Sequence, residues 1–112
     1  MTALRRNILY AKELKRIISV LKIKYKPEKI ILFGSFAQGN AQKDSDIDLM
    51  IIKETRQNPW KRQDTVERLV TRKVPVDLLV YTPRELKNRI DLGDTFTREV
   101  FTKGKLVYEK SS

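Results

Sequence analysis

The spacing of hydrophobic and polar positions divides the chain into segments with different expected structures. Residues 3–24 repeat apolar side chains at steps of three and four, the spacing of a helix with one buried face. Residues 30–33 are a continuous apolar run before a glycine, and residues 46–52 begin with alternating acidic and apolar side chains. Both segments have the pattern of buried strands. The helix face expected to be buried consists of Leu4, Ile8, Ala11, Leu14, Ile17, Ile18 and Leu21.

The second half of the chain carries clear start signals for helices. Asn58 followed by Pro59 predicts a helix that runs to about residue 72. An apolar strand is expected over residues 74–81, and Thr82 begins a capping box that opens a short helix. The helix after Asn58 is expected to bury, in part, the side chains of Trp60, Val66, Leu69 and Val70.

Two more elements follow, a helix over residues 95–102 that ends at Gly104 and a short strand over residues 106–108. Strands and helices therefore alternate, with one strand pair close in sequence. This order predicts an α/β (α+β) protein in which helices cover a small mixed β-sheet.

Length and composition exclude several classes of protein. At 112 residues, the chain is expected to form a single domain over residues 1–112. It has no cysteine and no histidine, so thiol nucleophiles and zinc–thiolate sites are excluded, and any general base is a carboxylate, lysine or tyrosine. No apolar run approaches the roughly 20 residues of a membrane span, and there is no signal-peptide pattern. We expect a cytoplasmic protein with no membrane partner.

The net charge of +10 is unevenly distributed. Residues 30–52 carry −2, whereas the segments around them are basic. A basic surround attracts a nucleoside triphosphate, and it attracts nucleic acid or an acidic partner protein equally well. A solvated basic surface without a partner has the same charge pattern, so charge alone does not select a function.

The acidic and glycine-containing positions of this central stretch suggest a site. Asp46 and Asp48 are two residues apart on a strand, so their carboxylates project from the same face. Two such carboxylates repel each other unless a cation lies between them, and hard divalent cations prefer oxygen ligands. Gly34 and Ser35 end the preceding strand and leave backbone N–H groups open to an anion. A cation site beside an anion site suits a nucleoside triphosphate with magnesium.

Two similar motifs do not fit. Asp44, Asp46 and Asp48 imitate the start of an EF-hand loop, but Leu49 stands where that loop requires glycine and Thr55 where it requires glutamate. The glycine turn is also not a Walker A loop, because the glycine-lysine-serine/threonine ending is missing.

Residues 34–39, GSFAQG, followed by residues 45–49, SDIDL, resemble the motif of the polymerase-beta-like nucleotidyltransferases. Within that superfamily the chain is most similar to the minimal nucleotidyltransferase (MNT) proteins, the antitoxin halves of HEPN–MNT toxin–antitoxin pairs. The similarity extends over nearly the whole chain and implies the polymerase-beta-like nucleotidyltransferase fold. One departure is Gln38, which stands where the family usually has arginine.

The resemblance also implies roles for individual residues. Asp46 and Asp48 would hold two magnesium ions, and Asp77 on the adjacent strand would complete the ion nearer the acceptor. Because the chain lacks histidine, Asp77 is also the best-placed candidate for the base that accepts the hydroxyl proton. Gly34 would let the backbone approach the phosphates, and Ser35 would donate to the β- and γ-phosphates.

Further expectations concern the substrate and the partner. Ser45 would orient the loop, and Lys43 would help to neutralise the triphosphate. The resemblance implies ATP as the substrate and a HEPN-type toxin as the partner, inactivated by adenylylation of a tyrosine hydroxyl. The small size of the chain also suggests that the acceptor lies on another macromolecule.

Two other functional classes stay open. An antitoxin could mask its toxin by binding alone, and replacement of the family arginine by Gln38 favours that alternative. A nucleic-acid-binding module driven by the +10 charge is the weaker alternative, because basic residues are not interleaved with aromatic ones. An oligomer is possible, and the sequence does not fix the nucleotide preference or the acceptor residue.

Overall fold

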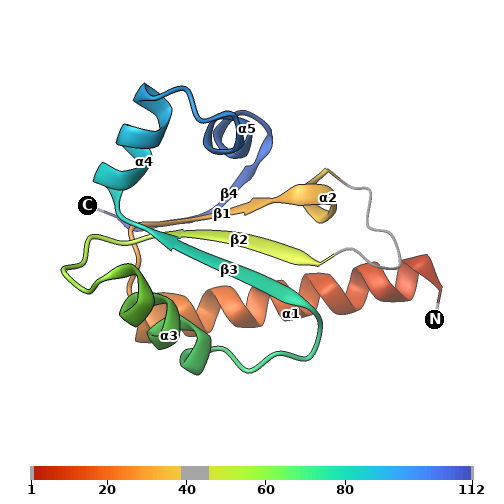
Figure 1. Ribbon diagram of the computed structural model, residues 1–112. Helices are drawn as coiled ribbons and strands as arrows, with labels where there is room; N and C mark the ends of the chain where they lie inside the picture. Colours follow the sequence, from red (N-terminus) through yellow and green to blue (C-terminus); the bar gives the residue numbers. More distant parts are fainter. Residues whose placement is uncertain (1, 39–45, 112) are drawn as a thin grey trace.

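The computed structural model describes residues 2–38 and 46–111, which form one mixed sheet with helices on both faces (Figure 1). The elements in chain order are α1 (Ala3–Lys24), β1 (Lys29–Phe33), α2 (Gly34–Ala37), β2 (Ile47–Ile52), α3 (Pro59–Leu69), β3 (Val76–Tyr81), α4 (Pro83–Asp91), α5 (Thr95–Lys103) and β4 (Lys105–Glu109). Every helix and strand expected from the sequence is present, and the α/β (α+β) fold class is confirmed.

The described strands are ordered β3-β2-β1-β4. Strand β1 is antiparallel to both of its neighbours, β2 and β4, whereas β2 and β3 are parallel. The crossover from β2 to β3 contains α3, as a parallel pair requires. This order places β3 directly beside β2, the strand that carries Asp48.

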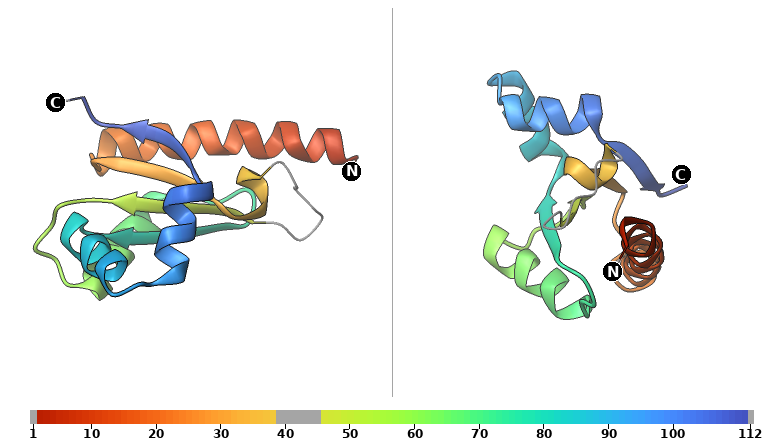
Figure 2. Two further views of the ribbon diagram at one scale, coloured as in Figure 1. Left: turned by 90° about the horizontal axis from the view of Figure 1, so that it is seen from above. Right: turned by 90° about the vertical axis from the view of Figure 1, so that its right-hand side faces the viewer.

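The helices form two layers around the sheet. Helices α1 and α3 cover one face, and α4 and α5 cover the other (Figure 2). Because side chains alternate along each strand, the two faces receive different residues. The larger core lies under α1 and α3 and includes Ile17, Leu21, Ile30, Leu32, Ile47, Leu49, Ile51, Val66, Val76, Leu78 and Val80. The smaller one, under α4 and α5, consists of Ile31, Met50, Ile52, Leu86 and Val100.

Strand β3 lies at the edge of the sheet, and side chains cover part of its outer edge. Backbone groups of Pro75 and Tyr81 pair with the β2 side, so the alternate residues face outward. The side-chain amide of Gln63 donates to the Leu78 carbonyl, and Arg72 Nε donates to the Val76 carbonyl at 3.1 Å. These bonds satisfy carbonyl groups that an edge strand otherwise exposes.

The buried face of α1 differs from the expected one. Leu4 and Ile8, predicted to be buried, are 69% and 49% exposed, whereas Tyr10 and Glu13 are buried. The N-terminal part of α1 extends past the ends of the strands (Figure 2), so its apolar side chains have no sheet to cover. The helix therefore contacts the sheet mainly with its C-terminal two thirds.

Trp60 is a second correction. The prediction that it is partly buried is wrong, because its side chain is 87% exposed. It occupies the first turn of α3, where Asn58 caps the helix by accepting from the Lys61 N–H at 2.9 Å.

The capping box at Thr82 is confirmed, with Glu85 as the reciprocal partner. None of the described helices is long and apolar enough to cross a membrane.

Candidate active site

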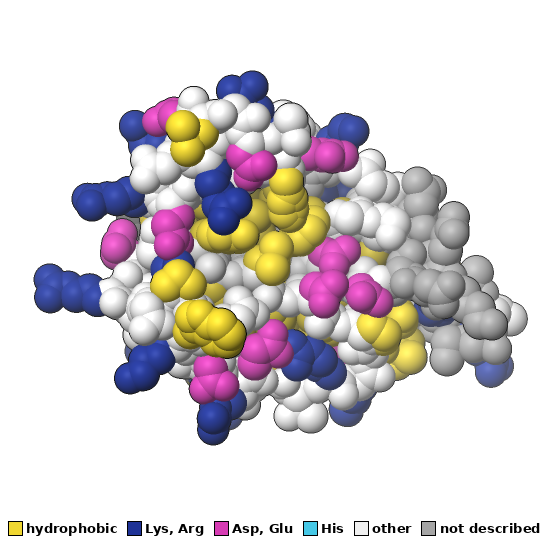
Figure 3. All heavy atoms as spheres, in the orientation of Figure 1, with side chains coloured by type: hydrophobic (Ala, Val, Ile, Leu, Met, Phe, Trp, Pro, Cys, Tyr) yellow, Lys and Arg dark blue, Asp and Glu magenta, His cyan; other side chains and the backbone are white. Residues whose placement is uncertain are grey.

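The parallel pairing of β2 with β3 brings two of the predicted carboxylates side by side. Asp48 and Asp77 are direct partners in the register, so their side chains leave the same face of the sheet. Asp46 lies immediately before β2 and is close enough for its charge to act on Asp48. Figure 3 shows acidic side chains gathered on the face of the molecule that α4 and α5 leave open.

The environment of Asp48 is unfavourable for a negative charge. The pKa of its carboxyl is raised to about 6, first by burial, then by the negative charges of Asp77 and Asp46 and by the hydrogen bond with Asp77. Asp77 itself is exposed, at the edge of the sheet. At neutral pH the carboxylates repel one another, and a bound cation would relieve the repulsion.

These donors fit a divalent metal ion in their chemistry, since they are all carboxylate oxygens. The arrangement of these side chains is less complete than a metal site requires. Within residues 2–38 and 46–111, no three acidic, histidine or cysteine side chains lie close enough together to enclose an ion. The structure therefore pairs Asp48 with Asp77 and puts Asp46 nearby, whereas coordination of metal by all three stays a prediction.

Gly34 brings the end of β1 against this acidic group. Its φ of 80° lies in the left-handed region that favours glycine, and a Cβ at this position would overlap Oδ2 of Asp48. The register is consistent with this contact, because Phe33 pairs with Asp48 across the β1–β2 ladder. Any larger residue at position 34 would have to displace the Asp48 carboxylate.

The other predicted residues of the phosphate site are only partly described. Ser35 lies in the first turn of α2, and its side chain is exposed. Lys43 and Ser45 lie outside the described residues. Gln38 follows α2, and its side-chain amide donates to the Lys103 carbonyl at 3.4 Å. Ser35 and Gln38 both line a cavity of about 490 Å³ beside the glycine–serine turn.

Helix α5 forms the other wall of this cavity, which the sequence pattern did not predict. From α5 the lining includes Phe96, Glu99 and Lys103, and Phe96 packs edge-on against Phe33 with ring centroids 5.6 Å apart. In this part of the sequence, Gly104 indicated only where α5 ends. The sequence pattern did not indicate that α5 would pack beside the end of β1.

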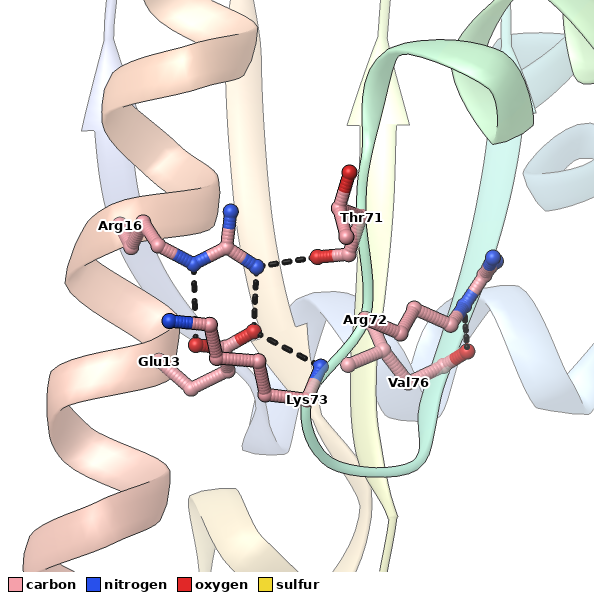
Figure 4. Close-up of polar contacts among 6 residues, drawn as sticks. All are labelled: Glu13, Arg16, Thr71, Arg72, Lys73 and Val76. Atoms are coloured by element: carbon pink, nitrogen blue, oxygen red, sulfur yellow. Dashed lines mark hydrogen bonds and ion pairs between the residues drawn. The ribbon is translucent and has the colours of Figure 1, made fainter.

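A partly buried ion pair positions the segment that leads into β3 and Asp77. Glu13 on α1 accepts from Arg16 and from the backbone N–H of Lys73, the latter at 3.1 Å (Figure 4). Arg16 also donates to the Thr71 carbonyl. The hydrogen bond from Arg16 is the main reason that the pKa of Glu13 is lowered, so this carboxylate stays charged and holds α1 to the loop before β3.

Comparisons with known proteins identify related sequences. The family model described as "Polymerase beta, Nucleotidyltransferase" matches residues 15–112. The chain is 31% identical over 99 residues to "Putative protein adenylyltransferase MJ0604" of Methanocaldococcus jannaschii, covering 87% of this chain and 96% of that protein. It is 46% identical over 43 residues to "Putative protein adenylyltransferase MJ1379" of the same organism, covering 35% of this chain and 43% of that one.

A solved structure has the same fold. The crystal structure of a "putative nucleotidyltransferase" from Sulfolobus solfataricus superposes with a TM-score of 0.69 at 25% sequence identity. The match covers 96% of this chain and 87% of the other.

Proposed function

The chain belongs to the polymerase beta nucleotidyltransferase family, and from this premise we propose that it transfers AMP from ATP to a hydroxyl group on a partner protein. The names of its relatives, which are called protein adenylyltransferases, support the choice of a protein acceptor. The observation that carries the proposal is the pairing of Asp48 with Asp77 directly beside the Gly34 turn.

The proposed reaction assigns a task to each described residue. The acceptor hydroxyl oxygen attacks the α-phosphorus, the bond from that phosphorus to the bridging oxygen of the β-phosphate breaks, and pyrophosphate leaves. Asp77, exposed at the edge strand, accepts the hydroxyl proton. Gly34 and Ser35 receive the phosphates at the end of β1, where a side chain at residue 34 would block their approach to Asp48.

Magnesium is part of the proposal. Asp46, Asp48 and Asp77 would hold two ions, which supply charge neutralisation for the phosphate oxygens. The pKa of Asp48 is raised first by burial and then by repulsion from Asp77 and Asp46, and a divalent cation would offset that repulsion, which supports this assignment.

We further propose that the partner is a HEPN-type toxin and that AMP transfer inactivates it, which makes this chain an antitoxin. The +10 charge suits an acidic partner surface. The cytoplasmic location stays a prediction.

Transfer of label tests the proposal. The full chain is incubated with α-³²P-labelled ATP, magnesium and the product of the neighbouring gene, and the partner is then examined for label. We expect label on the partner with the unchanged chain and none with Asp46→Asn. Asp64→Asn is the matched control, because Asp64 is exposed on α3 and pairs with Arg68 on the surface at 2.8 Å.

The alternatives give different results. A binding-only antitoxin would neutralise its partner without label, and Asp46→Asn would neutralise it equally well. A nucleic-acid-binding module would bind oligonucleotides with an affinity that falls steeply as salt rises and would be indifferent to Asp46→Asn.

A further inference from the structure

The C-terminal end of α5 forms one wall of the cavity beside the Gly34–Ser35 turn, and it contributes a lysine. We propose that Lys103 binds the terminal phosphates of the nucleotide and so positions the pyrophosphate leaving group. This inference rests on the proposed function, because it assigns a ligand for the substrate of that same site. Neither the sequence motif nor the matched relatives pointed to a residue of α5.

The backbone holds Lys103 tightly at this wall. Gly104 follows it, and a Cβ on Gly104 would overlap the Val100 carbonyl and lie 2.8 Å from Cγ2 of Ile31. Only a glycine therefore lets the end of α5 approach β1 this closely. The Gly104 N–H donates to the Val100 carbonyl at 2.8 Å, which ends the helix at this point.

Gln38 provides a second attachment on the opposite side of the cavity. Its side-chain amide donates to the Lys103 carbonyl at 3.4 Å, so the residue after α2 is joined to the end of α5. The Lys103 backbone is fixed by this bond and by the packing of Gly104, while the side chain remains long and flexible. A cation on a fixed base with a flexible stem suits a phosphate group that changes position during reaction.

The charge of Lys103 is available to a ligand. Among the described residues that line the cavity, Lys103 is the one with a positive charge. It pairs with Glu99 at 3.3 Å, one helical turn away, and both side chains are more than half exposed. Exposed pairs of this type contribute little free energy, so Lys103 can exchange Glu99 for a phosphate at small cost.

The direction of the bound triphosphate follows from the order of the strands. The acidic group lies on β2 and β3, and the cavity lies on the far side of the Phe33–Gly34 backbone, towards α5. With the α-phosphate at the carboxylates, a triphosphate that crosses the Gly34 turn brings its terminal phosphates into this cavity. The ribose and base then extend away from α5.

Nucleotide binding by the full chain tests the inference without depending on catalysis. Affinities for ATP and for AMP are measured with magnesium present, using Lys103→Gln, Lys103→Arg and the matched control Lys87→Gln. Lys87 forms the same kind of exposed pair on α4, with Asp91 at 3.6 Å, away from the cavity. We expect Lys103→Gln to weaken ATP binding about tenfold and to leave AMP binding unchanged, because AMP has no terminal phosphates.

Two further variants test the position of the charge. Lys103→Arg should retain ATP affinity, and Gln38→Arg combined with Lys103→Gln should restore it, since residue 38 lies on the same cavity.

In the labelling reaction Lys103→Gln should raise the KM for ATP about tenfold while kcat changes less.

Several results would overturn the inference. Equal weakening of AMP and ATP would mean that the cavity holds the base or that the fold has changed, and an equal effect of Lys87→Gln would mean that only overall charge matters. Unchanged ATP affinity in Lys103→Gln, with labelling by the unchanged chain intact, would remove Lys103 and leave the proposed function standing. If the unchanged chain bound no nucleotide, both proposals would fail.

Discussion

The two faces of the sheet are built from the same strands but differ in what they bury. Under α1 and α3 the side chains of β2 and β3 are apolar, and Ile47, Leu49 and Ile51 are fully buried. On the other face Met50 and Ile52 are buried under α4 and α5, whereas Asp48 lies beyond that cover. One face therefore serves mainly stability, whereas the other has less apolar surface because it carries the candidate active site.

The six residues of β2 contribute both to the large core and to the acidic group. Alternation along the strand puts Ile47 and Leu49 into the large core on either side of Asp48. Their burial fixes the register of β2, because a shift by one residue would expose them and bury the carboxylate. The core thus holds Asp48 next to Asp77 despite the repulsion between them.

Substitution of Asp48 tests the face of the sheet that carries the acidic residues. Asp48→Asn should lower labelling activity by at least roughly a hundredfold, because it removes a carboxylate proposed to hold metal. In the absence of metal, Asp48→Asn should raise the free energy of unfolding at pH 7.5 by about 1 kcal/mol, because it removes a charge that the neighbouring carboxylates repel. This value is discounted for the partial exposure of the Asp48 side chain. Unfolding by denaturant in the presence of a chelator measures the second effect.

The pH dependence of this variant gives a further check. The folded-state pKa of Asp48 is about 6, above its unfolded value of roughly 3.9. Between these values the folded state binds more protons than the unfolded state, so Asp48 makes the stability of the unchanged protein fall as pH rises from about 4 to 6. Asp48→Asn should lack this contribution. A variant less stable than the unchanged chain at pH 7.5 would mean that the Asp48 charge is not repelled in the folded protein.

A second substitution tests the other face. Ile17→Ala should lower the free energy of unfolding by about 2–5 kcal/mol, because Ile17 is fully buried between α1 and the sheet. The labelling activity per folded molecule should be retained, since the substitution is in the opposite layer. Ile8→Ala is the control on the same helix and should change stability by no more than about 0.5 kcal/mol, as Ile8 is half exposed. Equal costs at the two positions would refute the assigned burial of α1.

The smallest effect concerns the connection between α1 and the loop before β3. Glu13→Gln should lower the free energy of unfolding by about 1–2 kcal/mol, because charge-assisted hydrogen bonds from Arg16 and the Lys73 N–H become weaker. The folded-state pKa of Glu13 is lowered, so its contribution is present above the ordinary glutamate pKa of roughly 4.3.

That contribution is lost as pH falls through the lowered folded-state pKa. The difference between the variant and the unchanged chain, followed by thermal unfolding, should therefore shrink below about pH 4. A difference that stays constant from pH 7 to pH 3 would mean that the charge of Glu13 is not what holds the loop.

Local signals in the sequence predicted most of the fold and the acidic part of the site. The start of α3 follows from Asn58 and Pro59, and the start of α4 from the Thr82 capping box, since these signals act within one helical turn. The alternation in residues 46–52 predicted the face of Asp48, whereas the place of Asp77 on the adjacent strand was implied by the family resemblance.

Features that depend on tertiary packing were not predictable in this way. The exposure of Leu4 and Ile8 depends on where the strands end beneath α1, and apolar periodicity contains no such information. Trp60 is exposed in the first turn of α3, although the sequence predicted that this helix would bury it in part. The contribution of Lys103 to the cavity depends on the close approach of Gly104 to Ile31. These two residues are far apart in the sequence, so no local signal indicates their contact.

The covered outer edge of β3 limits how a partner can present its hydroxyl group. Gln63 and Arg72 already occupy the Leu78 and Val76 carbonyls, so a strand added beside Asp77 would first have to displace both side chains. An acceptor avoids this by coming down onto the open face, with its side chain directed at the carboxylates. A protruding loop or an exposed helix end on the partner can make that approach without displacing either side chain, whereas an extended segment laid along β3 cannot.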